Sequence, residues 1–305
     1  PYNLMNPEPS QYRFYSHPVF IGLGYLWIIW WFILPSNFDI TTDLIGFWGS
    51  DQMDTITLHW SVFNNESHFY PEGYDFWRLT PNVVDHLTFW PLQQILPFPL
   101  NLNLWWVGVI WFGALSAHWM MLQREGKHNI AWLAGVLYLM GEPLLREINW
   151  GHAPQSLWFP AFLSLGYWFK WAHSQRRMDL GMSILFGGLL GWCYLFYAPF
   201  LMLLMLPTLL RTSWKYSTLW LGGIVLLLLP NLYWVWMVSP EMTTIPNPPL
   251  IQGQTLLEMH SNDWLWWWNS TPIDVANQIS VVALVGLGWI LFRVKNHTTT
   301  LTLGG

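Results

Sequence analysis

Charged side chains are too rare in this chain for a water-exposed globular surface to be built from it. Asp, Glu, Lys and Arg make up 10% of the 305 residues, and apolar residues make up 53%. A typical soluble domain carries about 25% charged residues. The chain has 26 tryptophans but only 12 lysines and arginines together. Much of its surface must face something other than water, so the composition predicts an all-α protein that spans a lipid bilayer.

Cysteine content and net charge exclude several classes of function. The single cysteine, Cys193, excludes a disulfide framework and any zinc site built from cysteines. A net charge of −5 without a basic patch argues against a nucleic-acid partner and leaves membrane lipids as the expected surroundings. We expect residues 1–305 to form a single transmembrane domain, without a soluble carboxy-terminal domain in this chain.

Seven apolar stretches approach the roughly 20 residues that a helix needs to cross a bilayer. The third is short and is expected to continue as helix toward Leu145. The fifth contains a break near Gly191 to Pro199, which divides it into two spans and brings the total to about eight crossings. The stretches are residues 19–35, 101–123, 130–140, 156–172, 180–210, 218–238 and 278–294.

The distribution of charge along the chain predicts the orientation of these spans. If the spans alternate in direction, ten of the 12 lysines and arginines fall on one side, with only Arg78 and Arg146 on the other. Short loops rich in Lys and Arg stay in the cytoplasm. Both termini of the chain are therefore predicted to be cytoplasmic, and 14 of the 17 acids extracytoplasmic. The outer loops are residues 36–100, 141–155 and 239–277.

The first outer loop is the longest connection in the chain and is dense in Asp, Trp and Pro. Loops of this length are usually functional. We expect it to contain short amphipathic helices that lie along the membrane surface, because aromatic side chains favour that interface. These helices would carry Trp48, Trp60, Trp77 and Trp90.

Asp51 and Asp54 are the first candidate site residues, within the sequence Gly49-Ser50-Asp51-Gln52-Met53-Asp54-Thr55. Two carboxylates three residues apart lie on one face of a helix. Such a pair can hold a divalent cation or divide acid and base roles. The alternative is that both are solvated loop acids or helix caps.

Short polar motifs follow in the outer segments, in a recognisable order. They are Tyr70-Pro71-Glu72-Gly73, Asp85-His86, Trp150-Gly151-His152-Ala153-Pro154-Gln155, the aromatic break 194–199, and His260-Ser261-Asn262-Asp263-Trp264-Leu265. Together with the Asp51–Asp54 element, this order resembles the amino-terminal part of bacterial membrane proteins of the GT-C glycosyltransferase superfamily. The resemblance covers roughly residues 15–295. It implies a GT-C-like transmembrane bundle in the bacterial inner membrane.

The resemblance also implies an activity, the transfer of a sugar from a polyprenyl-phosphate donor to an extracytoplasmic acceptor. In this family an acidic residue of the first outer loop acts as the catalytic base or helps to hold a divalent cation such as Mg²⁺ or Mn²⁺. Asp54, assisted by Asp51, best matches that residue. The leaving phosphate needs positive charge or hydrogen-bond donors. Residues that would bind the substrate are Asp85, His86, Arg146, His152 and Asp263. Alternatively, Arg146 pairs with Glu142 or Glu147 at a helix end.

Two other functions remain open at this point. Family members are commonly longer than this chain, which favours a catalytically inactive membrane subunit or scaffold with protein partners in a larger complex. A transporter would place ionisable groups within its spans, whereas His118 is nearly the only such group here. The histidines lack paired spacing within the predicted spans, so the sequence predicts no haem site.

Overall fold

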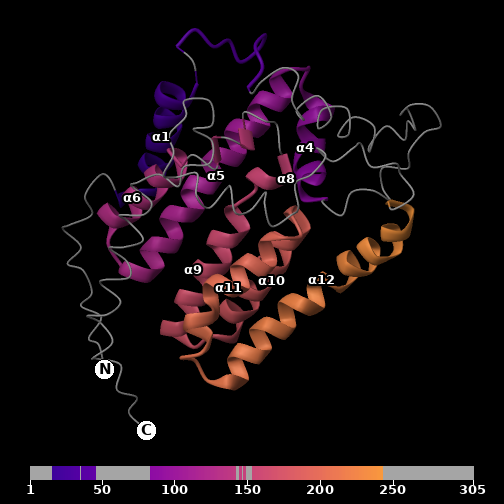
Figure 1. Ribbon diagram of the computed structural model, residues 1–305. Coiled ribbons are helices and arrows are strands. Elements are labelled where there is room, and N and C mark those ends of the chain that lie inside the picture. Colours follow the sequence, from indigo (N-terminus) through magenta and orange to yellow (C-terminus); the bar gives the residue numbers. More distant parts are fainter. Residues whose placement is uncertain are drawn as a thin grey trace, which may run out of the picture.

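The computed structural model describes residues 16–34, 36–45, 83–141, 144–145, 147–148 and 153–242. Every regular element within these ranges is a helix, which confirms the all-α prediction for this part of the chain (Figure 1). The predicted last span, residues 278–294, lies outside the described residues, as do Trp48, Trp60 and Trp77. The elements are α1 (Pro18–Ile28), the π-helix η3 (Ile29–Ile33), α4 (Val84–Ile95), α5 (Leu100–Glu125), α6 (His128–Leu139), α8 (Ala153–Ser156), α9 (Phe159–Ser174), α10 (Arg177–Cys193), α11 (Tyr197–Leu209) and α12 (Trp214–Met242).

The first six of the seven predicted apolar stretches coincide with these helices, with one correction. The second stretch is α5, and the expected break in the fifth lies between the end of α10 at Cys193 and the start of α11 at Tyr197. The expected continuation of the third span toward Leu145 is wrong, because α6 ends at Leu139. The chain turns at Gly141, whose N–H donates to the carbonyl of Tyr138 three residues earlier.

Among the described residues, two helices are long and apolar enough to cross a membrane by length and composition. They are α5 and the Trp214–Tyr233 part of α12. Other apolar helices, Pro18–Ile33, His128–Leu139 and Tyr197–Leu209, are shorter. Most of the α5 span is buried, because α4, α6 and α9 pack around it, whereas α12 lies along one side of the bundle and packs against α10 (Figure 1).

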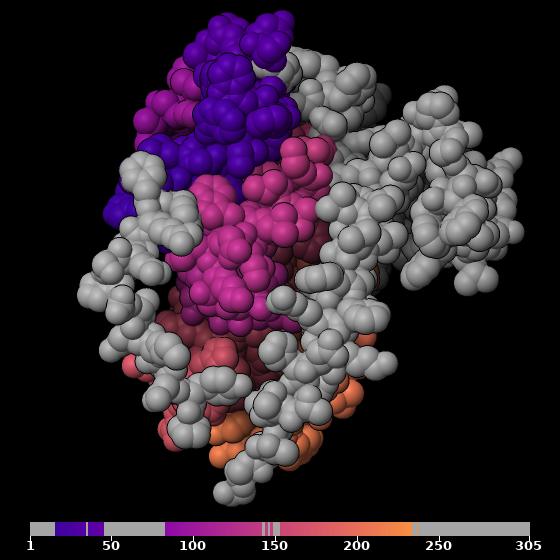
Figure 2. Space-filling view, turned by 90° about the vertical axis from the view of Figure 1, so that its left-hand side faces the viewer, coloured from indigo at the N-terminus to yellow at the C-terminus, as the bar shows by residue number. Residues whose placement is uncertain are grey.

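The outer helices present large apolar side chains to the exterior. On α1 and η3 these include Trp27, Trp30, Trp31 and Phe32, and α11 and α12 expose many leucines. Figure 2 shows α1 (indigo) at one end of the visible face and α12 (orange) at the other. An apolar exterior of this kind suits lipid, whereas a soluble monomer rarely exposes such large contiguous patches.

Small and hydroxyl side chains bring the helices into close contact inside the bundle. Ser164 of α9 and Ser183 of α10 each donate a hydrogen bond to the other's carbonyl at 2.8 Å, and Trp220 Nε1 of α12 donates to Ser183 Oγ at 2.9 Å. Gly113 and Gly135 leave room for the tyrosine rings of Tyr138 and Tyr25, respectively. Small residues and interhelical hydrogen bonds are typical of helices that pack in membranes.

The helices alternate in direction, so the bundle has two ends with different charge. At one end Arg124 of α5 lies over the Phe169 ring of α9, and Ser217 of α12 donates to the carbonyl of Leu209 at 2.8 Å. Trp171 of α9 packs against Tyr216 of α12 there. We call this the cation end, because it carries all the described lysines and arginines. They are Arg124, Lys127, Lys170, Arg176, Arg177, Arg211 and Lys215.

The opposite end is acidic, and we call it the acidic end. Two hydrogen bonds connect its segments. The Val83 N–H donates to the Trp192 carbonyl at 3.1 Å, and the Tyr197 hydroxyl donates to the Gln155 carbonyl at 2.8 Å. Its described acids are Asp39, Asp43, Asp85 and Glu147. Within the described ranges, the separation of cations and acids by end follows the pattern expected from the sequence.

Candidate functional site

The structure describes only two of the seven residues predicted to form the site. Asp85 and His86 lie on α4 at the acidic end. The remaining predicted residues lie outside the described residues: Asp51, Asp54, Arg146, His152 and Asp263. The described part of the site is therefore built around α4.

Helix α4 is held against the rest of the bundle on more than one side. Trp105 Nε1 of α5 donates to Thr88 Oγ1 at 3.0 Å, and the Phe89 and Trp105 rings meet edge to face with centroids 6.2 Å apart. The backbone of Val83, just before α4, bonds to the end of α10. Helix α8 also contacts α4. These contacts fix the position of the first turn of α4, which carries Asp85 and His86.

Asp85 and His86 are both buried, with 1% and 2% of their surfaces exposed. Neighbouring residues on a helix point about 100° apart, so the first turn of α4 is covered on more than one side. Helices α5, α8 and α10 all contact α4. The Asp85 carboxylate lies within electrostatic range of the Cys193 thiol at the end of α10. Acidic side chains are rarely buried, because their burial is costly in free energy unless they are hydrogen-bonded or paired.

Glu147 is a further acidic residue of this end that sequence reasoning considered only as a partner for Arg146. Its charge acts on the hydroxyl of Tyr197, at the start of α11. The Tyr197 ring packs against Trp158 with centroids 4.3 Å apart and against Tyr194 at 5.0 Å. The sequence feature that could have pointed to Glu147 is the aromatic break at residues 194–199, because the α10–α11 turn formed there lies near the segment containing Glu147.

The Asn103 side chain ties the described beginning of the first outer segment, residues 40–45, to α5. Its amide donates to the carbonyls of Ile40 at 2.8 Å and Asp43 at 2.6 Å, and its oxygen accepts from the Ile45 N–H at 3.0 Å. Asp39 forms a turn in which the Thr41 hydroxyl and N–H donate to its carboxylate. These bonds lower the pKa of Asp39 below its usual value. The acid is therefore ionised on the surface of the acidic end.

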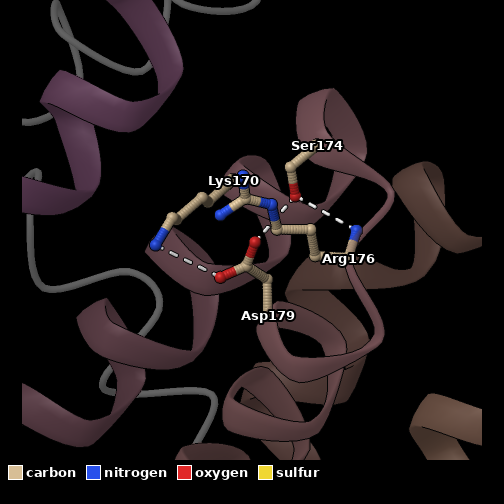
Figure 3. A network of polar contacts seen from close by, with 4 residues as sticks. All are labelled: Lys170, Ser174, Arg176 and Asp179. Atoms are coloured by element: carbon tan, nitrogen blue, oxygen red, sulfur yellow. Dashed lines mark hydrogen bonds and ion pairs between the residues drawn. The ribbon is translucent and has the colours of Figure 1, made fainter.

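The cation end contains a buried acid, Asp179, that is paired with a lysine (Figure 3). Asp179 lies in the first turn of α10, accepts from Ser174 Oγ at 2.7 Å and pairs with Lys170 Nζ at 3.2 Å. Ser174 Oγ in turn accepts from the Arg176 N–H at 3.2 Å. Burial opposes the ionisation of Asp179, but the hydrogen bonds from Ser174 and Lys170 and the nearby positive charges outweigh it and lower its pKa. This network fastens the α9–α10 turn.

The acidic end could support acid–base chemistry with the side chains described. A carboxylate and an imidazole can each accept or donate a proton. Within the described ranges, no three His, Cys, Asp or Glu side chains come together as a metal site. The predicted metal ligands, Asp51 and Asp54, lie outside those ranges, so their fit to Mg²⁺ or Mn²⁺ stays a prediction.

Comparisons of the chain with protein-family models, with curated proteins and with solved structures find no match. Its function therefore has to be inferred from its own residues and their geometry. The two features that bear on function are the charge difference between the ends and the buried pair on α4.

Proposed function

We propose that the chain is a GT-C-like membrane glycosyltransferase that moves a sugar from a polyprenyl-phosphate donor to an extracytoplasmic acceptor. In this proposal it crosses the bacterial inner membrane about eight times, with both termini in the cytoplasm. The acidic end faces outward and carries the reaction. Membrane lipids surround the bundle and the lipid-linked sugar enters from the bilayer.

The observation that carries the proposal is the separation of charge between the two ends of an apolar-faced bundle. All the described lysines and arginines lie at the cation end, and four described acids lie at the acidic end. The positive-inside rule then orients the acidic end away from the cytoplasm. Exposed apolar side chains on α1, η3, α11 and α12 support contact with lipid between the two ends.

The reaction requires a proton acceptor and a site for the leaving phosphate. The attacking hydroxyl of the acceptor loses its proton as the bond to the anomeric carbon forms and the bond to the lipid phosphate breaks. We assign the proton acceptor to Asp54, with Asp51 beside it. Asp85, His86 and Asp263 would hold the sugar or acceptor, and Arg146 and His152 would stabilise the phosphate. A divalent cation held by Asp51 and Asp54 would add positive charge there.

The test is sugar transfer from a polyprenyl-phosphate donor by the purified full chain in lipid nanodiscs. Asp54→Asn keeps the shape of the side chain and removes its basicity, so transfer should fall by about 10²–10⁴-fold. The matched control is Asp43→Asn, because Asp43 is an exposed acid of the same end whose carboxylate accepts a backbone hydrogen bond from Asp39. Full transfer by Asp54→Asn would remove Asp54 from the chemistry.

A second variant tests the described part of the site. Asp85→Asn should weaken substrate binding by roughly 10–100-fold, because a hydrogen bond to a charged group contributes about 1.5–3 kcal/mol. The Michaelis constant should rise while the thermal midpoint stays close to that of the wild type. Unchanged kinetics with a lowered midpoint would assign Asp85 to the structure of α4 alone.

One observation favours the alternative of a catalytically inactive membrane subunit. Asp85 and His86 are almost completely enclosed, so a sugar would reach them only after α4 moves. A scaffold needs no such motion. Wild-type protein that transfers no sugar from any polyprenyl-phosphate donor, yet co-purifies with stoichiometric partners, would favour this alternative.

A further inference from the structure

We propose that His118 and His128 form a two-imidazole site for a divalent transition-metal ion at the cation end of the bundle. His118 lies near the end of α5, and His128 is the first residue of α6. Their ring centroids are 5.8 Å apart and the rings are tilted by 47°. This site is separate from the acidic end and does not depend on the function proposed for it.

The contact with Tyr25 occupies Nδ1 of His118 and leaves Nε2 as the nitrogen that can ligate a metal ion. His118 Nδ1 lies 2.8 Å from the hydroxyl of Tyr25, which donates its own proton to the carbonyl of Trp132 at 3.3 Å. In the proposed site His118 Nδ1 carries the proton and donates to the Tyr25 hydroxyl in the shorter contact, and the hydroxyl proton goes to the Trp132 carbonyl. The lone pair of the neutral imidazole is then on Nε2. A metal-binding histidine typically has its other nitrogen held in this way.

The two nitrogens that remain are buried and have no hydrogen-bond partner within the part of the chain that the structure describes. They are His118 Nε2 and His128 Nδ1. His118 is 3% exposed and His128 is half-buried. Leaving a buried polar atom without a partner is unfavourable in free energy. A bound ion that both nitrogens ligate removes that cost.

The spacing of the rings fits such an ion. With metal–nitrogen bonds of about 2.0–2.1 Å, two imidazoles on one ion hold their centroids roughly 5–6.5 Å apart. Imidazole ligands suit Zn²⁺, Cu²⁺ and Ni²⁺ rather than Mg²⁺ or Ca²⁺. Half-buried His128 would leave a route of entry from the end of the bundle, and water would complete the coordination.

The neighbouring charges leave room for a cation. Arg124 is paired with Glu125 at 3.4 Å and its guanidinium lies over the Phe169 ring of α9. Lys127 is exposed, so its long side chain can extend into water. This pair was not found from the sequence, because only histidines within the predicted spans were compared and His128 precedes the apolar stretch at residues 130–140. The turn at Gly126, with a φ of 66°, brings the two rings together.

The test is Cu²⁺ titration of the full chain in nanodiscs, followed by electron paramagnetic resonance. We expect one saturable site whose spectrum carries coupling to two imidazole nitrogens. His118→Gln and His128→Gln should each abolish the two-nitrogen signal, and His173→Gln should keep it, because His173 is exposed at the end of α9. Tyr25→Phe keeps both histidines but releases Nδ1, and should weaken binding about 10–100-fold.

The proposal is overturned if wild-type protein gives no saturable site, which would leave the two nitrogens to a bridging water. It is also overturned if the two-nitrogen signal survives in both His118→Gln and His128→Gln. Zn²⁺ provides an independent check, because it should raise the thermal midpoint of the wild type and of His173→Gln but not of His128→Gln. Equal Zn²⁺ stabilisation of all three would contradict the site.

Discussion

The two ends of the bundle use acidic side chains in opposite ways. At the cation end the buried acid, Asp179, has a hydroxyl, an ammonium group and nearby positive charge around it. At the acidic end Asp85 and His86 are buried side by side, and none of the described lysines or arginines lies there. The first arrangement is what a structural turn needs, and the second places a carboxylate and an imidazole together, the two groups that general acid–base chemistry uses most often.

This difference shows that burial alone does not distinguish a structural acid from a candidate functional acid in this chain. Asp179 and Asp85 are similarly inaccessible, at 5% and 1% exposed. The two acids differ in the groups that surround them. The partners of Asp179 come from the turn it fastens, whereas the environment of Asp85 is assembled from α5, α8 and α10, which are distant in sequence.

The largest effect on stability is expected at the acidic end, from Asn103→Ala. This substitution removes three hydrogen bonds that tie residues 40–45 to α5. At about 0.5–1.5 kcal/mol each, the loss should be roughly 2–4 kcal/mol, measured by denaturation in detergent micelles. Asn101→Ala is the matched control, because among the described residues the Asn101 oxygen accepts from the adjacent Leu102 N–H rather than from another segment. Equal losses for both would mean that Asn103 does not anchor the loop.

A smaller loss is expected at the cation end, from Asp179→Asn. Removal of one partner from a buried ion pair can cost about 3–5 kcal/mol, but Lys170 is 42% exposed, so solvent screening reduces the expected loss to about 1–2 kcal/mol. Sugar transfer should not change. A fall in transfer without a fall in stability would break the proposed division between the two ends.

The Asp179 carboxylate should also make the free energy of unfolding depend on pH. Because the folded-state pKa of Asp179 is below its usual value, its contribution to stability is complete above the unfolded pKa of about 3.9. The contribution is lost as the pH falls through the folded pKa. Acid titration of the free energy of unfolding should therefore show a smaller decline below about pH 4 in Asp179→Asn than in the wild type. Parallel curves would contradict the pairing.

The smallest effect is expected where α4 rests on α5. Thr88→Val removes the hydroxyl that accepts from Trp105 Nε1, at a cost of about 1 kcal/mol. Thr218→Val is the control, because the bonds of the Thr218 hydroxyl within the described ranges go to carbonyls of its own helix. Protease cleavage near α4 should increase in the first variant and not in the second. No difference between them would mean that this bond does not hold α4.

Helix positions were largely predictable from the sequence, because long apolar stretches leave few alternatives. The stretch at residues 101–123 became α5, and the Gly and Pro around residues 191–199 marked the α10–α11 break. The end of α6 was mispredicted because the turn at Gly141 depends on local hydrogen bonds rather than on hydropathy.

The site was predictable only in part, for a physical reason. That Asp85 and His86 are polar and lie before α5 is visible in the sequence, but adjacent helical residues ordinarily face different surroundings. Their shared burial requires α5, α8 and α10 to meet around α4. The Glu147–Tyr197 and His118–His128 pairs likewise join residues from separate segments, which no spacing rule brings together.

The most direct test of the account is the side of the membrane on which each end lies. In a Cys193→Ala background, Thr42→Cys places a single exposed thiol at the acidic end and His173→Cys places one at the cation end. A membrane-impermeant maleimide added to intact bacteria should label Thr42→Cys and should label His173→Cys only after lysis. Labelling of His173→Cys alone in intact cells would put the acids in the cytoplasm and contradict the proposed outward-facing site.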